Sequence, residues 1–209
     1  MEFIPKEVEV PPIPSPEPVR LEAKGSAVIV VDMQRDFVEE AGRLYVGPSA
    51  QKTVPRIHSL LAEARRHGVP VIYTQDWHAE GSSEFALWGQ HCLRGSEGAD
   101  FIEELKPEPG DKVVRKETYD PFYGTDLERI LRELSIRNLV IVGTVSNICV
   151  LHAVSGAALR GLRVIIPVDC ISAITDFDAI LALRQFTFLY KATLTRSDIL
   201  SFQNHERLL

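Results

Sequence analysis

Cysteine is scarce in this sequence, and long apolar runs are missing. The three cysteines, Cys92, Cys149 and Cys170, are too few and too odd in number to form a disulfide scaffold, so we expect a reducing, cytoplasmic location. No segment approaches the roughly 18 consecutive apolar residues of a membrane span, and the N-terminus lacks the pattern of a signal peptide. We therefore expect no membrane contact.

Basic residues are outnumbered by acidic ones. Lys and Arg total 23 against 29 Asp and Glu, which gives a net charge of −6, and the longest basic run is the pair Arg65–Arg66. Proteins that bind nucleic-acid phosphates carry basic patches, so we expect no nucleic-acid partner. With 209 residues, 45% of them hydrophobic, the chain is long enough for one domain with a proper core.

Proline is concentrated near the N-terminus, at positions 5, 11, 12, 14, 16 and 18. Such a segment cannot form a helix and favours extended chain. We therefore divide the chain into a proline-rich arm, residues 1–25, and a folded domain, residues 26–209. Two interpretations of the arm stay open: a disordered tail, or a segment that packs on its own domain or on a neighbouring subunit.

Short apolar runs rich in β-branched residues recur along the domain. Continuous runs of this kind are typical of strands that are buried on both faces of a parallel sheet. The expected strands are 27–32, 69–76, 112–116, 139–144, 162–169 and a weaker sixth at 192–196.

Helical periodicity fills the gaps between the strands. The expected helices are 53–68, 125–136, 147–161 and 176–190. In the second of these, we expect Thr125 to be the N-cap and Glu128 to complete a capping box. Alternating strands and helices predict an α/β fold: a single doubly wound, mostly parallel six-stranded sheet with helices on both faces.

Polar residues follow several of these strands, where sites form in open α/β sheets. Cys149 lies in the first turn of a predicted helix, which favours a thiolate, and Lys116 would lower the pKa of its thiol further. Asp32 could take the thiol proton and return it to a leaving group. Alternatives are a buried structural cysteine, a simple Asp32–Lys116 ion pair, and a Cys–His dyad with His152.

The segment TQDWHAEGSSEFALWGQHC, residues 74–92, contains several possible metal ligands. Asp76 and His78 alternate along the chain, so they can point the same way, and Glu84 and His91 lie in the loop that follows. Two imidazoles with one or two carboxylates suit zinc, or iron or manganese with added waters. The alternative is a polar loop in which such residues occur by chance.

Taken together, these motifs resemble the isochorismatase-like cysteine hydrolase superfamily, and within it most of all the nicotinamidases (pyrazinamidases). The resemblance covers roughly residues 26–196 and implies a Rossmann-like hydrolase fold. The matching segments, in chain order, are VVDMQRDF (30–37), TQDWH (74–78), WGQHCLRGSEGADF (88–101), Lys116 and GTVSNICV (143–150).

The resemblance implies roles for individual residues. The catalytic triad would be Asp32, Lys116 and Cys149. The metal ligands would be Asp76, His78 and His91, with Glu84 as a fourth. The aromatic pair that holds a pyridine ring would be Phe37 and Trp88.

The superfamily also places a cis peptide bond just before the nucleophile, here expected at Val145–Ser146. The backbone N–H groups of Val145 and Cys149 would then form an oxyanion hole. The implied reaction is hydrolysis of nicotinamide to nicotinate and ammonia through a thioester on Cys149, with a divalent metal, zinc first, as cofactor.

Two departures put the substrate in doubt more than the reaction. Many nicotinamidases have Ala-Thr-Asp-Tyr-Cys where this chain has VSNIC, and the proline common before the HC pair is missing from WGQHC. The alternatives are therefore the same chemistry on another small amide of ureido, maleamate or carbamoyl type, or a non-catalytic member of the fold. Isochorismatase activity is not expected, because Cys149 is present. Family members are often dimers or tetramers, so we expect a homo-oligomer.

Overall fold

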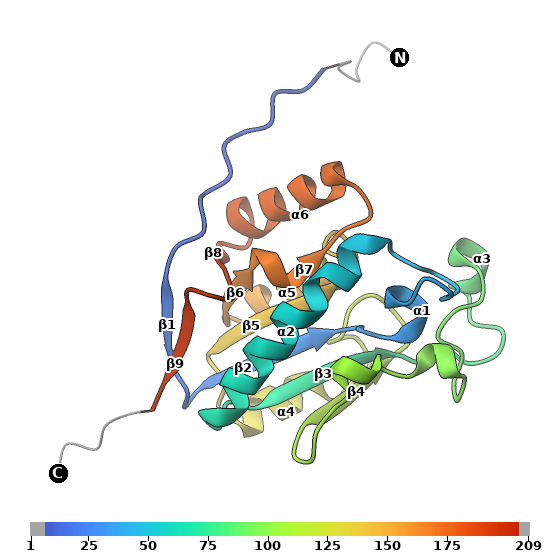
Figure 1. The fold of residues 1–209 in the computed structure, drawn as a ribbon, viewed down its shortest axis with the longest axis horizontal. Helices are drawn as coiled ribbons and strands as arrows, with labels where there is room; N and C mark the ends of the chain where they lie inside the picture. The colour runs from blue at the N-terminus through green and yellow to red at the C-terminus, as the bar shows by residue number, and fades with distance from the viewer. Residues whose placement is uncertain (1–6, 205–209) are drawn as a thin grey trace.

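A parallel sheet of six strands in the order β4-β3-β2-β5-β6-β8 forms the centre of the molecule (Figure 1). The computed structural model describes residues 7–204, so positions 1–6 of the predicted arm and 205–209 of the predicted domain lie outside it. The strands are β2 (Ser26–Val31), β3 (Val71–Asp76), β4 (Lys112–Lys116), β5 (Asn138–Thr144), β6 (Arg163–Pro167) and β8 (Thr193–Thr195), with the short β7 (Ile171–Ser172) beside β5.

The predicted α/β class and the doubly wound, parallel arrangement are confirmed. All six expected strands are present. The seventh, β7, was not predicted, because two residues carry no readable periodicity.

Helices cover both faces of the sheet. They are α1 (Arg35–Val38), α2 (Pro48–Arg66), α3 (Phe85–Trp88), α4 (Leu127–Glu133), α5 (Cys149–Leu159) and α6 (Asp176–Phe188), with 3₁₀ turns η1 (Glu97–Ala99), η2 (Glu103–Leu105) and η3 (Val168–Cys170). Helix α2 begins earlier than predicted, because Pro48 fits a first helical turn, where its missing N–H is not needed.

The predicted capping box at α4 is wrong. Asp126 is the N-cap, and the Thr125 hydroxyl instead accepts the N–H of Leu127 at 3.2 Å. The Glu128 side chain does not reach back to the cap, because it pairs with Arg132 and Arg160.

The sheet separates two apolar clusters because alternate strand residues point to opposite faces. Val28 and Val30 of β2 pack toward α2, which crosses in front of the sheet in Figure 1. Ala27, Ile29 and Val31 of the same strand pack toward α4, α5 and α6. This two-sided burial explains the continuous apolar runs of the sequence.

A small second sheet joins the two ends of the described chain. β1 (Val19–Glu22) pairs in parallel with β9 (Leu200–Gln203), and Val19 and Leu21 are buried there. The preceding residues extend beyond the body of the molecule (Figure 1), with Val8 and Val10 71% and 49% exposed. Part of the proline-rich segment therefore packs on its own domain.

Gly143 lets two central strands approach closely where the candidate site begins. A Cβ at this position, where φ is +115°, would lie 2.1 Å from the carbonyl oxygen of Val31 on β2. Only glycine tolerates both the close approach and this backbone conformation. The contact sets the ends of β2 and β5 side by side, directly before Asp32 and Val145.

Candidate active site

Three buried side chains meet at the carboxyl ends of the strands. Asp32 follows β2, Lys116 ends β4, and Cys149 opens α5. The Nζ of Lys116 lies 2.7 Å from Oδ2 of Asp32 and 3.7 Å from Sγ of Cys149. The structure thus brings together all three residues that the sequence predicted, although strands β2 and β4 are separated by β3 in the sheet.

Asp32 is held by Thr74, a residue that the sequence analysis missed. The Thr74 hydroxyl donates to Oδ1 of Asp32 at 2.5 Å, and it accepts the Asp32 N–H at 3.2 Å. Asp32 adopts a φ of +51°, which is uncommon for a residue other than glycine and is enriched at functional sites. The sequence feature that could have indicated this role is the polar Thr74 within the mostly apolar strand β3.

Lys116 lowers the pKa of the Cys149 thiol, as predicted, but the net shift is in the opposite direction. Burial is the largest cause and raises the pKa of the Cys149 thiol well above its usual value, and the charges of Asp32 and Asp76 raise it further. Burial likewise raises the pKa of Asp32. Burial alone would lower the pKa of Lys116, but its two carboxylate neighbours raise that pKa well above its usual value. The resting arrangement is therefore a thiol beside a Lys–carboxylate cluster.

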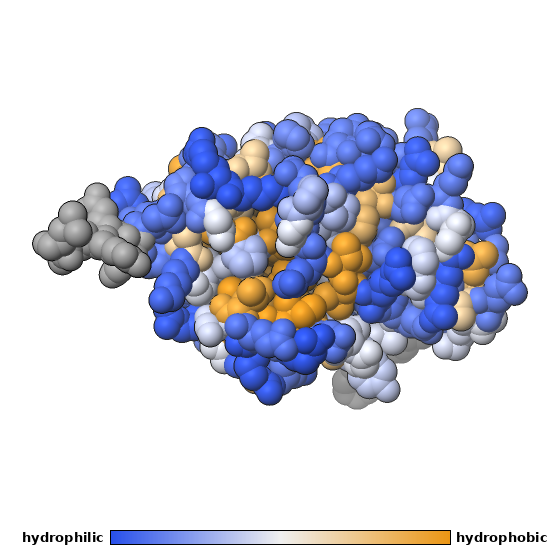
Figure 2. Space-filling model, turned by 90° about the horizontal axis from the view of Figure 1, so that it is seen from below, coloured by the Kyte–Doolittle hydropathy of each residue, from blue (hydrophilic) through white to orange (hydrophobic). Residues whose placement is uncertain are grey.

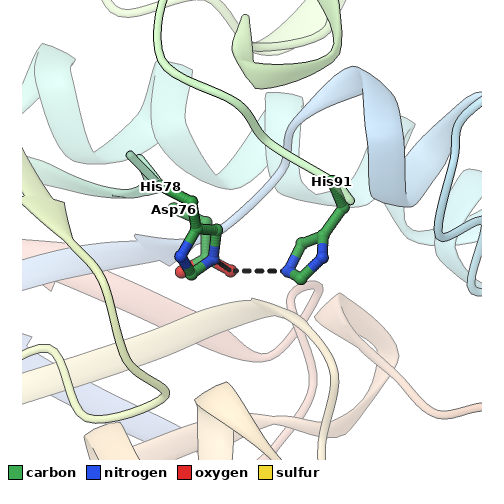
Figure 3. Close-up of side chains that lie close together, drawn as sticks. All are labelled: Asp76, His78 and His91. Atoms are coloured by element: carbon green, nitrogen blue, oxygen red, sulfur yellow. Dashed lines mark ion pairs between the residues drawn. The ribbon is translucent and has the colours of Figure 1, made fainter. Parts of the chain in front are cut away.

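A second cluster adjoins the first through Asp76. Ligand atoms of Asp76, His78 and His91 all lie within 4.8 Å of one another. In Figure 3, Asp76 and His78 come from the end of β3 and the residues after it, and His91 approaches from the loop after α3. The Nε2 atoms of His78 and His91 lie 3.5 and 3.9 Å from Oδ2 of Asp76.

The donor atoms of this cluster fit a divalent metal. The Nε2 of His78 is buried and has no hydrogen-bond partner among the described residues. The Nδ1 of His91 lies 2.9 Å from the carbonyl oxygen of Gly89, which can only accept a hydrogen bond. This contact places the proton on Nδ1 and leaves the lone pair of Nε2 directed at the cluster, as metal-binding histidines require.

Glu84 stands beside the metal cluster without joining its tight core. It is the N-cap residue of α3, and its Oε2 lies 3.8 Å from Nε2 of His78. Burial, together with the charge of Asp76, raises the pKa of the Glu84 carboxyl. The predicted fourth ligand therefore lies next to His78 but outside the group formed by Asp76, His78 and His91.

Two polar side chains missed by the sequence analysis fasten this region. The buried amide of Gln34 donates to the carbonyl oxygens of Asp76 and Ala99, and it accepts the N–H of Asp76 at 2.7 Å. Asp36 is buried and accepts the N–H of Cys92 at 2.7 Å. Both are polar residues of the motif VVDMQRDF, and that position is the sequence feature that could have indicated their role.

A cavity lined mostly by apolar side chains opens onto the thiol, and a few polar groups converge on it, as is typical of small-molecule sites. Its walls are Phe37, Leu44, Tyr45, Val46, Asp76, Glu84, Trp88, His91, Tyr119, Val145, Ile148, Cys149 and Ile174. Both predicted ring-binding residues, Phe37 and Trp88, line it. The indole N–H of Trp88 donates to the hydroxyl of Tyr119 at 2.6 Å, which fixes the plane of this wall.

The turn before the nucleophile differs from the prediction by one bond. The cis peptide joins Thr144 to Val145, so the expected position at Val145–Ser146 is wrong. The bond lies directly where β5 ends. Within the described chain, the N–H groups of Val145 and Cys149 donate no backbone hydrogen bond, so both are free to meet a ligand.

The rival base His152 points elsewhere. Its Nδ1 lies 2.8 Å from the carbonyl oxygen of Ile148, and its ring packs beside Tyr119 at 5.5 Å. No hydrogen bond between His152 and Cys149 exists in the described structure.

Comparisons with known proteins agree with this arrangement. A family model described as the isochorismatase domain matches residues 26–198. The N-carbamoylsarcosine amidase of Thermoplasma acidophilum is 38% identical with a TM-score of 0.77, covering 83% of this chain and 96% of that one. The nicotinamidase PncA of Bacillus subtilis is 29% identical with a TM-score of 0.78, and the match covers 82% of this chain and 99% of that one. The ureidoacrylate amidohydrolase RutB of Agrobacterium fabrum is 34% identical over 65% of this chain and 70% of that protein.

Proposed function

Because the chain belongs to the isochorismatase family, we propose that it is a metal-containing cysteine amidohydrolase, and that it converts nicotinamide to nicotinate and ammonia. The similar proteins named above include amidohydrolases that act on several small amides. The chemical character of the cavity supports the choice of substrate among them.

The observation that carries this choice is the absence of a cation on the cavity wall. Among the described residues that line the cavity, none is Arg or Lys. Lys116 pairs with both Asp32 and Asp76, and Glu84 lies beside His78, so acidic side chains outnumber the single lysine of the site. A substrate that carries a carboxylate, as ureidoacrylate and N-carbamoylsarcosine do, would find no basic side chain on the described cavity wall and would have to compete for the metal. A flat, neutral ring fits between Phe37 and Trp88.

The triad supports a two-step hydrolysis. The thiol of Cys149 attacks the amide carbonyl carbon while its proton passes to Asp32, and Lys116 holds Asp32 in place. The oxyanion accepts hydrogen bonds from the N–H groups of Val145 and Cys149, each typically worth about 3–4 kcal/mol. Asp32 then protonates the leaving ammonia, and a thioester remains on Cys149.

Water completes the cycle. Asp32, now ionised again, accepts a proton from a water molecule that attacks the thioester carbon. The carbon–sulfur bond breaks, the acid is released, and the thiol of Cys149 is restored.

The metal would be held by Asp76, His78 and His91, with Glu84 as a fourth ligand. Zinc suits this set of nitrogen and oxygen donors, and iron or manganese could also occupy it. When bound, a divalent cation supplies a Lewis acid that orients a ring nitrogen or a water molecule, and it offsets the excess negative charge of the site.

A ureido or carbamoyl substrate is the second candidate. The 38% identity with the N-carbamoylsarcosine amidase exceeds the 29% identity with the nicotinamidase. The intact set of Asp32, Lys116 and Cys149 makes a non-catalytic protein the weakest candidate, because a protein without catalytic function has no need to retain it.

The decisive experiment compares ammonia release from nicotinamide, ureidoacrylate and N-carbamoylsarcosine by zinc-loaded protein. We expect release from nicotinamide only. Cys149→Ala should abolish release, whereas Cys170→Ala, a fully buried cysteine in η3, should retain it. Release from the two acids but not from nicotinamide would replace the proposed substrate. Activity in Cys149→Ala would refute the proposed nucleophile.

We also propose a cytoplasmic location, because the three cysteines are buried and unpaired, as in a reducing compartment. No helix among the described residues is long and apolar enough to span a bilayer. We further propose that the chain forms a homo-oligomer.

A further inference from the structure

Helix α6 presents apolar side chains on two opposite faces. On one face, Ala182 and Phe186 are fully buried against the body of the protein. On the other, Phe177, Leu181 and Phe188 follow one another at intervals of four and seven residues and are 70%, 38% and 57% exposed. Ile180, 38% exposed, adjoins them. A helix that is apolar on both sides is typical of one that is buried on both sides.

The stripe formed by Phe177, Ile180, Leu181 and Phe188 has the spacing of a helix-pairing seam. Residues at such positions lie in line along one side of a helix, where they pack against a second helix. Arg184, between them, lays its guanidinium over the ring of Phe188 at 3.8 Å. The stripe thus extends along the full length of α6.

Charges at the two ends of α6 are opposite. Asp176 opens the helix, and Asp178 follows it, bonded to Asn147 and to the Thr175 cap. Lys191 follows the C-terminal end. If a copy of the helix lies antiparallel, its basic end meets the acidic end of the first, so the surface is complementary to itself.

We propose that two copies of this chain pair through α6, antiparallel and about a two-fold axis. The pairing places Phe177 of each copy against Phe188 of the other, and Asp176 of each copy near Lys191 of the other. A two-fold interface uses the same patch on both subunits, as this self-complementary charge pattern requires.

The position of α6 in the molecule leaves room for a second copy. Figure 1 shows α6 at the upper edge of the body, packed on α5. The N-terminal arm passes β8, where Glu17 exchanges hydrogen bonds with Leu194 and Thr195, and continues beyond the body on the same side. The outer part of the arm, which carries the exposed Val8 and Val10, thus extends on the same side of the molecule as α6.

A competing surface lies at the opposite edge of the sheet. Figure 2 shows apolar residues gathered on the underside, where β4 and α4 lie. On β4, Val113 is 42% exposed and the next residue, Val114, is buried. This patch has no helical seam, so α6 is the stronger candidate.

The pairing also bears on the cavity. Ile174, 54% exposed, lines the cavity and immediately precedes Thr175, the N-cap of α6. A copy seated on α6 would cover this rim and narrow the access of solvent to the cavity.

Light scattering coupled to size exclusion, over a broad range of protein concentration, tests the proposal. The full-length chain should have a mass that is an even multiple of the chain mass. Leu181→Glu should halve it, with a dissociation constant raised roughly 100-fold, because a carboxylate would be buried without a partner. Val113→Glu adds the same charge to the competing patch and should leave the mass unchanged. A monomeric wild type, or dissociation by Val113→Glu and not by Leu181→Glu, would overturn the proposal.

A charge exchange tests the antiparallel orientation and does not depend on core packing. Asp176→Lys and Lys191→Glu should each weaken the pair, and the double variant should restore it, because the opposite charges then meet again. Circular dichroism on each variant checks that the fold is retained. If the double variant dissociates more readily than either single variant, the antiparallel arrangement is wrong.

Discussion

Asp32 shows how strongly the environment of one carboxylate governs the proposed chemistry. Burial favours its neutral form, whereas Lys116 at 2.7 Å and the Thr74 hydroxyl at 2.5 Å favour its ionised form. In the proposed reaction Asp32 must first accept the thiol proton and then give it up. Thr74 is therefore a positioning residue that acts through Asp32.

Replacement of Thr74 by Val should impair the transfer of protons more than the binding of substrate. A hydrogen bond to a charged group contributes about 1.5–3 kcal/mol, so kcat should fall about 10- to 100-fold with little change in KM. The hydroxyl lowers the pKa of Asp32, so its loss raises that pKa. The acid limb of the pH–rate profile should accordingly move to higher pH.

Steady-state kinetics over a range of pH on the amide that the wild type hydrolyses would measure both effects. Thr53→Val is the matched control, because Thr53 is also buried but its hydroxyl donates to the Ala50 carbonyl oxygen within α2, away from Asp32. An unchanged acid limb in Thr74→Val would show that the hydroxyl does not act through Asp32.

The sequence predicted the meeting of Asp32, Lys116 and Cys149 but could not predict the protonation of the thiol. Strand ends share one edge of a parallel sheet, so position along the chain was sufficient to bring the three together. The balance of charge depends on distances and burial, and here desolvation and two carboxylates outweigh one ammonium. Thr74 escaped notice because one hydroxyl in an apolar strand has many possible partners.

At the scale of elements, the loop that carries His91 is fastened to the segment that carries Phe37. Asp36 accepts the N–H of Cys92 with one oxygen and the N–H of Arg43 with the other. A Cβ on Gly98 would lie 2.3 Å from the Asp36 carboxylate, so the chain closes tightly around it. The loop could not be placed from sequence, because it has no regular periodicity and owes its path to these bonds.

Asp36→Asn should weaken metal binding, because an amide can accept only one of the two N–H bonds and its NH₂ group would face the other. Loss of such a supporting contact typically lowers metal affinity about 10- to 100-fold. Isothermal titration of the metal-free variant with zinc would measure it. Asp111→Asn is the control: that carboxylate accepts the Glu108 N–H at the far end of β4 from Lys116. Equal zinc affinities in the two variants would contradict the assigned role of Asp36.

At the scale of the whole molecule, the central sheet could be predicted from the sequence, whereas the β1–β9 sheet and the short strand β7 could not. Six apolar runs identified the central strands because burial on both faces leaves a strong compositional signal. The pairing of β1 with β9 joins residues that are far apart in sequence. The nearby prolines predicted extended chain but did not indicate which strand would pair with it. The candidate metal ligands, in turn, connect the end of β3 with the loop that follows α3.

Zinc should therefore stabilise the whole fold, because it binds the native arrangement of ligands and not the unfolded chain. At 100 times its dissociation constant, a ligand adds about 2.7 kcal/mol, which corresponds to a rise in Tm of about 5–10 °C for a chain of this size. Differential scanning calorimetry with zinc and with EDTA would measure the shift. His91→Ala should remove it, whereas His58→Ala, an exposed histidine on α2, should retain it. A shift of equal size in His91→Ala would show that zinc stabilises the protein elsewhere.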